Sequence, residues 1–213
     1  MADDLKYGYK GAEPTQSFGN NTGVFDPNDI NNLIADNKWT TFGQLELIET
    51  QVADGTSTYI DFTTLNESTY NVHFVTFDNM QWATADTFGA RVSDDGGSTF
   101  EATSNYDGAL QQGNTAGSFS EATRVNHTSF DRILQSQANL PHSGYCYFYN
   151  LGDSAKYSFM TQHTLNWGGG NMQFKFGSQV YKVASTINAL RFFNGVYNLS
   201  SGSTISLYGI RYS

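Results

Sequence analysis

From Gln44 onward, apolar and polar residues alternate in short segments that are separated by clusters of Gly, Asn, Asp and Ser. A period of two is that of a strand with one buried face. Many short segments of this kind predict an all-β protein, an antiparallel β-sandwich of about eight to ten strands, with a jelly-roll-like arrangement. We expect these strands near Leu45 and Leu47 and at residues 58–62, 70–77, 88–92, 145–150, 156–160, 172–176, 187–193 and 204–212.

The alternation also predicts which side chains enter the core. Tyr70, Val72 and Phe74 share one face of their segment, which we expect to point inward, while Asn71 and His73 share the other. Two more segments repeat the pattern, with the apolar positions Phe88, Ala90 and Val92 in one and Met172, Phe174 and Phe176, alternating with Gln173 and Lys175, in the other. The polar stretch Gly108–Thr123 is longer than a hairpin loop usually is, and we expect it to be exposed or used in contacts.

Residues 1–38 differ from the rest of the chain. Glycines and asparagines surround the isolated aromatics Tyr7, Tyr9, Phe18 and Phe25 without a sustained period. This pattern predicts an extended N-terminal docking arm at 1–38, followed by a sandwich domain at 39–213. The four aromatics are candidate virion-docking anchors, because a partner can order such a segment around them; the alternative is a tail folded back over its own domain.

One helix start stands out within the predicted arm. Asp26 is a suitable N-cap and Pro27 suits the first helical position, where a missing backbone N–H costs nothing. We therefore expect a short helix from Pro27 onward.

Charge narrows the classes of partner. The net charge is -9 with a pI near 4.7, which disfavours nucleic acid and anionic membranes as partners. No apolar run approaches the roughly 20 residues of a spanning helix, and the first residues lack the pattern of a signal peptide. The single cysteine, Cys146, lies in a strand-like run and fits inert core packing in a protein folded in a reducing cytosol.

Ser93–Phe100 fits an Asp-box, Ser-x-Asp-x-Gly-x-Thr-aromatic, which resembles hairpin motifs of sialidases and other carbohydrate-linked β proteins. Its physics is local, because the Asp carboxylate accepts backbone N–H bonds, a glycine supplies positive φ and the aromatic packs beneath the hairpin. A single copy predicts a stabilised turn and no catalytic role.

No other constellation predicts catalysis, a metal or a cofactor. The histidines, His73, His127, His142 and His163, lack ligand spacing. Neither a Gly-x-Ser-x-Gly elbow nor a His-Glu-x-x-His helix is present. The carboxylate pairs Glu46/Glu49 and Asp94/Asp95 suit solvated edges and turns, and Gly168–Gly170 suits a turn. Trp39, Trp82 and Trp167, with many tyrosines, suit either core and subunit interfaces or a sugar-stacking platform.

Several segments resemble a family of small virion proteins from tailed phages, frequent in marine phages. They include the run YFYNLGDSAKYSF at 147–159 and the Ser-Leu-Tyr-Gly-Ile pattern at 206–210, with further segments at 7–34, 67–79, 91–103 and 187–212. The resemblance covers most of the chain. It implies a structural role and passes on no active-site residue.

Together these observations predict a non-enzymatic virion protein that folds in the host cytoplasm. Our first hypothesis is a capsid decoration, or cement, protein that docks on other virion proteins through its arm and forms a homotrimer, because oligomers cover exposed sheet edges. The alternative is a short head or tail fibre that binds host surface glycans. A third hypothesis, an enzyme that cuts capsular polysaccharide, requires two carboxylates about 5–9.5 Å apart in a cleft.

Overall fold

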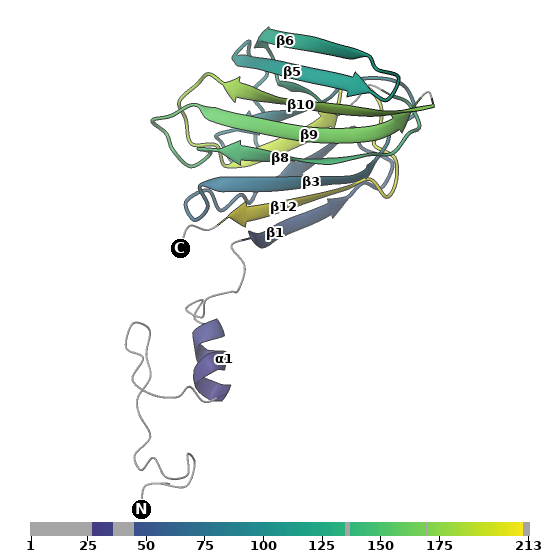
Figure 1. Ribbon diagram of the computed structural model, residues 1–213. Helices are drawn as coiled ribbons and strands as arrows, with labels where there is room; N and C mark the ends of the chain where they lie inside the picture. Colours follow the sequence, from purple (N-terminus) through teal and green to yellow (C-terminus); the bar gives the residue numbers. More distant parts are fainter. Residues whose placement is uncertain (1–26, 36–44, 135–136, 169, 211–213) are drawn as a thin grey trace, which may run out of the picture. The chain divides into compact units, whose positions relative to one another are not determined.

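The computed structural model describes residues 27–35, 45–134, 137–168 and 170–210, and it divides the chain into two compact units, Met1–Gly43 and Gln44–Ser213 (Figure 1). In the first unit, α1 spans Pro27–Ala35, which confirms the predicted helix and its start at Pro27. Asp26, the predicted N-cap, lies outside the described residues, as does Trp39, so the boundary at 38/39 stays a prediction.

The second unit is an all-β sandwich of two antiparallel sheets, as predicted from the alternation. The eight-stranded sheet has the order β1-β12-β3-β8-β9-β10-β5-β6 and the four-stranded sheet the order β2-β11-β4-β7. The strands are β1 Leu45–Val52, β2 Tyr59–Phe62, β3 Val72–Met80, β4 Phe88–Ser93, β5 Tyr106–Asn114, β6 Phe119–His127, β7 Phe130–Leu134, β8 His142–Tyr149, β9 Ser158–Gly168, β10 Asn171–Tyr181, β11 Ala189–Asn194 and β12 Thr204–Ile210. The jelly-roll arrangement stays a prediction.

The core between the two sheets is built around aromatic rings. Phe192 of β11 lies at its centre, with ring centroids 5.5 Å from Phe77 and 6.1 Å from Phe148, both on the large sheet. On its own sheet it meets Phe62 at 6.0 Å in an edge-to-face contact. Such pairs add about 0.5–1.5 kcal/mol each beyond their buried area. Phe88, Ala90 and Val92 are fully buried, as predicted.

The strands of two segments were not predicted from the sequence. The stretch Gly108–Thr123 is largely exposed, as predicted, but it also forms most of the paired strands β5 and β6. Its polar character reflects a hairpin at the rim of the larger sheet, where β6 is an edge strand. β7 was not predicted, and the sandwich holds twelve strands among its described residues, more than the eight to ten expected.

The inward face of β3 is the opposite of the predicted one. His73 is fully buried, whereas Val72 and Phe74 point away from the core and are only partly buried. Tyr70 is buried as expected, but it precedes the strand and packs edge-to-face on His73. The His73 Nε2 atom lies 2.8 Å from the Leu65 carbonyl oxygen, which gives the inward imidazole a hydrogen-bond partner.

β10 shows the same inversion more strongly. Lys175 is only 2% exposed, whereas Phe176 beside it is 44% exposed and Met172 is exposed as well. Strand β9 has the same inverted orientation, because its inward positions include Gln162, Thr164 and Asn166. Both strands therefore point several polar side chains into the sandwich and most of their aromatic ones out of it, while Met160 and Tyr181 lie in the core.

Candidate functional site

The outward side of the eight-stranded sheet carries many exposed apolar and aromatic side chains. The paired positions Tyr208, Phe74 and Tyr147 follow one another across β12, β3 and β8, so their side chains share one face. We call this surface the aromatic face. It consists of Leu45, Leu47, Val52, Phe74, Phe119, Tyr145, Tyr147, Tyr149, Phe159, His163, Leu165, Trp167, Met172, Phe174, Phe176 and Tyr208.

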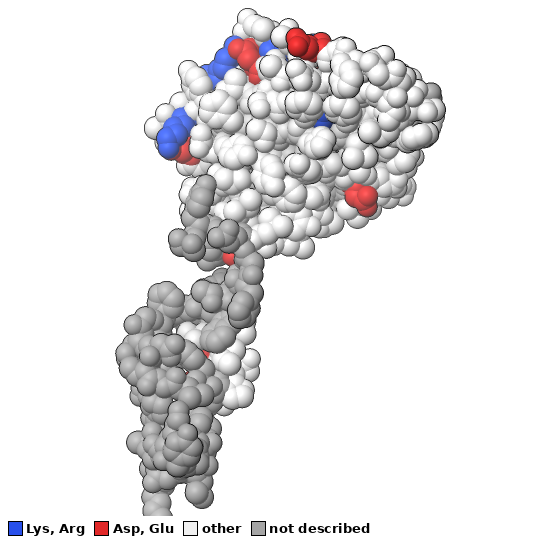
Figure 2. Space-filling view, in the orientation of Figure 1, with Lys and Arg blue, Asp and Glu red and all other residues white. Residues whose placement is uncertain are grey.

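The rings of the aromatic face touch one another across strands. The Phe74 ring centroid lies 4.8 Å from that of Tyr147 and 5.9 Å from that of Tyr208. Further along the sheet, Phe174 stacks on Phe176 at 6.1 Å. Figure 2 shows the same surface almost free of charged side chains, which gather at its margins. The aromatic face is therefore apolar, rich in aromatic rings and poor in charged side chains.

The inward polar side chains of β9 and β10 bind the backbone of β7. Gln162 Nε2 donates to the carbonyl oxygens of residues 132 and 133 at 2.9 and 3.1 Å, and Thr164 Oγ1 donates to that of residue 133 at 2.8 Å. Lys175 Nζ donates to the carbonyl oxygen of residue 134 at 3.1 Å. Gln179 donates to the Asp131 carbonyl oxygen at 2.8 Å and accepts from its N–H at 2.9 Å. We call these four residues the polar layer.

The polar layer has a physical cause in the irregular pairing of β7. Only two register pairs, Phe88 with Leu134 and Ala90 with Phe130, join β7 to β4, with a bulge between them. Buried carbonyl groups that a neighbouring strand does not satisfy need other donors. The polar layer supplies these donors, and this explains why the apolar residues of β9 and β10 face outward.

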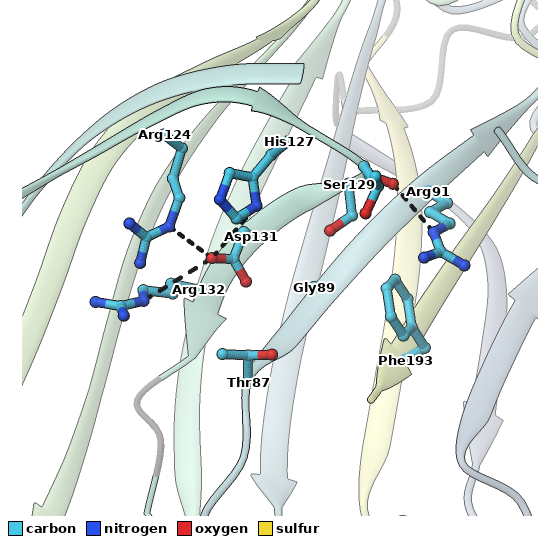
Figure 3. Close-up of a pocket in the computed structure, with 10 residues that line it drawn as sticks. Thr87, Gly89, Arg91, Arg124, His127, Ser129, Asp131, Arg132 and Phe193 are labelled. Atoms are coloured by element: carbon cyan, nitrogen blue, oxygen red, sulfur yellow. Dashed lines mark hydrogen bonds and ion pairs between the residues drawn. The ribbon is translucent and has the colours of Figure 1, made fainter. Parts of the chain in front are cut away.

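A basic pocket lies between β6, β7 and the outer side of the four-stranded sheet (Figure 3). One wall is built around the Asp131 carboxylate, whose Oδ2 atom accepts a hydrogen bond from Arg124 Nε at 2.6 Å. Arg132 Nε lies 3.8 Å and His127 Nδ1 3.9 Å from the same oxygen. The pocket volume is about 500 Å³.

Arg91 of β4 forms the opposite wall of the basic pocket. Its Nε atom donates to the Thr128 carbonyl oxygen at 3.1 Å, and its guanidinium lies 4.6 Å from the centroid of the Phe193 ring. A cation over an aromatic face is attracted by the ring quadrupole. Figure 3 shows Arg91 and Phe193 on one side of the pocket and the Asp131 cluster on the other.

The Asp-box forms the turn that its sequence predicts. Asp95 Oδ1 accepts from the Thr99 N–H at 2.9 Å, and Asp95 Oδ2 accepts from Thr99 Oγ1 at 2.6 Å. These bonds and one from Ser93 lower the Asp95 pKa to about 2, chiefly through Thr99. Gly97 has a φ of 86° and Phe100 lies beneath the Arg191 guanidinium. The Asp95 carboxylate is therefore used within the turn, and Asn188 ties the turn to the rest of the domain through hydrogen bonds with the Gly96 N–H and the Asp94 carbonyl oxygen.

The other candidates are dispersed. His142 is buried and stacks on Trp82 at 4.7 Å, whereas His163 belongs to the aromatic face and His127 to the basic pocket. Within the described ranges, no three His, Cys, Asp or Glu side chains are grouped to hold a metal ion. Cys146 is fully buried, and burial raises its pKa well above the usual range, as core packing predicts.

The predicted carboxylate pairs have structural partners. Glu46 accepts a hydrogen bond from the Tyr70 hydroxyl at 2.7 Å, and Glu49 accepts one from Gln51 at 2.9 Å. Gly168 and Gly170 lie at the connection between β9 and β10. Gly170 has a φ of 80°, in agreement with the predicted turn.

The aromatics divide between core and surface. Trp82 is fully buried, whereas Trp167 is 61% exposed on the aromatic face. The four candidate docking residues, Tyr7, Tyr9, Phe18 and Phe25, lie outside the described residues, so their role stays a prediction.

Comparison with known proteins gives no relative for this chain: no protein-family model, curated protein or solved structure matches it significantly. Over the part of the chain that the structure describes, no helix has the length and apolar character needed to span a membrane.

Neither the aromatic face nor the basic pocket was predicted from the sequence. The aromatic face was missed because period two does not say which of two faces is buried. The basic pocket did leave a signal in the run RVNHTSFDR at 124–132, which places two arginines, a histidine and an aspartate within nine positions of a chain with few charges.

Proposed function

We propose that this protein is a non-enzymatic structural subunit of a tailed-phage virion that assembles with copies of itself through the aromatic face. The observation that supports this assembly is the aromatic face itself, which has many exposed rings and almost no charged side chains. Soluble proteins rarely expose large contiguous apolar patches unless they mark an interaction surface.

The exposed area is large enough for a stable contact. The side chains at least a third exposed are Leu45, Leu47, Val52, Phe119, Tyr145, Phe159, Leu165, Trp167, Met172 and Phe176. Since a large aromatic side chain offers roughly 150–250 Å², these residues together expose on the order of 1,000 Å². A standard interface takes about 800 Å² from each partner.

The charge distribution favours a second copy as the occupant. Two chains of net charge -9 repel each other wherever acidic groups meet, but the aromatic face keeps such groups away from its centre. Tyrosine hydroxyls both donate and accept hydrogen bonds, so the same side chains can pair across copies. A homotrimer is the expected assembly.

The virion assignment is supported by the resemblance of residues 147–159 and 206–210 to virion proteins of tailed phages. Repeated copies on a particle suit an acidic sandwich with one strongly apolar face. Within this assignment, a capsid decoration protein that docks through residues 1–38 is the expected role.

The test is a charge placed on the aromatic face. Phe176→Glu puts a carboxylate beside His163 and Phe174, where burial against a sister copy would cost several kcal/mol. We expect the full chain to be trimeric in sedimentation analysis and the variant to be largely monomeric.

The matched control is Val196→Glu, because Val196 is 70% exposed but lies between β11 and β12. This control should stay oligomeric. A monomeric wild-type chain, or a Phe176→Glu variant that assembles as the wild type does, would contradict the proposed role of the face.

A further inference from the structure

The basic pocket concentrates positive charge in an acidic protein. Of the 11 Lys and Arg residues in the chain, Arg91, Arg124 and Arg132 line this one cavity. Asp131 is the carboxylate that lines it, so the lining carries a net charge of +2 with His127 neutral. The proposed assembly through the aromatic face makes no use of this charge.

The guanidinium groups that line the pocket retain N–H donors that the described hydrogen bonds do not use. Each guanidinium has five N–H donors, yet the described hydrogen bonds of Arg91 involve only Nε, to the Thr128 carbonyl oxygen. Arg132 lies 3.8 Å from Asp131, beyond hydrogen-bond distance. Arg124 uses Nε and one further nitrogen, toward Asp131 and the Thr123 carbonyl oxygen. Such planar donors bind carboxylate, sulfate or phosphate oxygens in pairs.

The backbone of Arg132 is in a strained conformation. Arg132 has a φ of 55°, in the left-handed region that non-glycine residues avoid, and it lies within the bulge of β7. Bulges redirect side chains and are frequent beside functional sites. The strain is offset by Gln162, which binds the carbonyl oxygen of residue 132 at 2.9 Å. The polar layer thus preorganises the pocket wall.

Size and lining indicate the class of ligand. A volume of about 500 Å³ exceeds the needs of one inorganic anion and suits a small organic molecule. Hydroxyl groups of Thr87, Thr128 and Ser129 line the cavity beside the Phe193 ring. Hydroxyls, guanidinium groups and one ring together match a sugar that carries an acidic group.

We propose that the basic pocket binds an acidic saccharide unit, carboxylated or sulfated, with its oxyanion at Arg91 and its ring hydroxyls toward the cluster of Arg132, Arg124 and Asp131 on the opposite side (Figure 3). Arg124, held by Asp131, lies beside Arg132 on that opposite side. The shared chemistry is the oxyanion on a hydroxyl-rich ring, and the two sources of that oxyanion are separated by the choice of probe.

The experiment is calorimetric titration of the full chain with four probes. They are a disulfated chondroitin disaccharide, digalacturonate, lactose and sodium sulfate. We expect at least one of the two acidic disaccharides to bind and lactose not to bind. Arg91→Gln and Arg132→Gln should each weaken that binding about tenfold or more, the usual loss for one charge-assisted hydrogen bond.

Two further variants complete the design. Lys156→Gln removes the same charge from a surface turn away from the pocket and should leave affinity unchanged. Arg132→Lys keeps the charge but lacks the planar fork, so its affinity should fall between those of wild type and Arg132→Gln. Thermal melting confirms that each variant is folded.

Four results would overturn the proposal: no binding of either acidic disaccharide, equal binding of lactose, binding of sulfate alone, or affinities that the two Gln variants leave unchanged. A Gln variant that alters the oligomeric state without affecting sugar binding would assign the pocket to an acidic side chain of a sister subunit instead. Because the readout is ligand affinity, a failure here leaves the test of the aromatic face intact.

Discussion

Lys175 places an ammonium group inside the sandwich, on a strand whose aromatic residues point outward. Its Nζ atom donates to the carbonyl oxygen of residue 134, and no carboxylate forms a described salt bridge with it. Burial lowers the pKa of Lys175 to about 8, and the nearby Arg132 acts in the same direction. The folded protein therefore binds this proton less tightly than the unfolded chain does.

The pH dependence of stability follows from this shift. Between the folded pKa of about 8 and the unfolded value of about 10.4, the unfolded chain binds more protons, so the free energy of unfolding rises with pH. We expect a gain of about 2 kcal/mol between pH 7.5 and 9.5 in urea unfolding at fixed protein concentration. Lys175→Met should abolish this rise.

Lys156→Met is the control, because Lys156 is exposed and its pKa is raised by Asp153. It should retain the full rise, since its folded and unfolded forms both stay charged below pH 9.5. A wild-type protein without the rise, or a Lys175→Met variant that keeps it, would refute the assignment of this titration to Lys175.

At the same scale, the sequence located β10 but not its orientation. Phe174 and Phe176 alternate with Lys175, and burial by hydrophobicity alone places the two rings inside. The decisive factor is the bulged backbone of β7, whose carbonyl groups need donors. That requirement comes from a strand about 40 residues away, so no local pattern contains it.

Among the elements, β7 depends on the polar layer more than on its sheet. Two register pairs tie it to β4, whereas Gln179 alone binds both the N–H and the carbonyl oxygen of Asp131. Gln179 also donates to the Gln162 side chain at 3.0 Å, which joins β9 and β10 in one network. Buried networks of this kind are costly to break in part.

Gln179→Leu tests this dependence. It removes both bonds to the Asp131 backbone, and each buried group left without a partner costs about 1–3 kcal/mol. We expect the free energy of unfolding to fall by about 2–4 kcal/mol and the amide hydrogens of Phe130–Leu134 to exchange faster.

Ser178→Ala provides the comparison on the same strand, because Ser178 is exposed on the outward side of β10. Its effect should stay within about 0.5 kcal/mol. Equal effects of the two substitutions, or unchanged exchange in β7 of the Gln179 variant, would show that β7 is held by its sheet instead.

Most strands were predictable because their alternation is local, and β4 was predicted with the correct face as well, since Phe88, Ala90 and Val92 contact the aromatic core. β5 and β6 were not, because a paired hairpin at a sheet rim can be as polar as a loop. β7 is short, and its alternation is broken by the bulge around Arg132.

For the whole molecule, the arm at 1–38 is expected to connect the sandwich to the particle. Replacing Tyr7, Tyr9, Phe18 and Phe25 by Ser in the full chain removes the predicted anchors and leaves the sequence of Gln44–Ser213 unchanged. We expect an unchanged oligomeric state and circular dichroism spectrum but loss of attachment to particles that lack the protein, measured by co-sedimentation.

The matched control replaces polar arm residues, Thr15, Gln16, Asn20 and Thr22, by Ser and should attach normally. Attachment that survives loss of the four aromatics would leave the arm without its assigned role. The basic pocket shows the limit of sequence reasoning at this scale, because Arg91 and Arg132 come to line one cavity only through the packing of β7 on β4.

Cys146 can report on opening of the sandwich. It is the single cysteine of the chain and lies fully buried on β8. A thiol reacts with alkylating reagents as its thiolate, and burial raises its pKa. Iodoacetamide can therefore label the protein only when the two sheets part, and the labelling rate reports how often the folded sandwich opens.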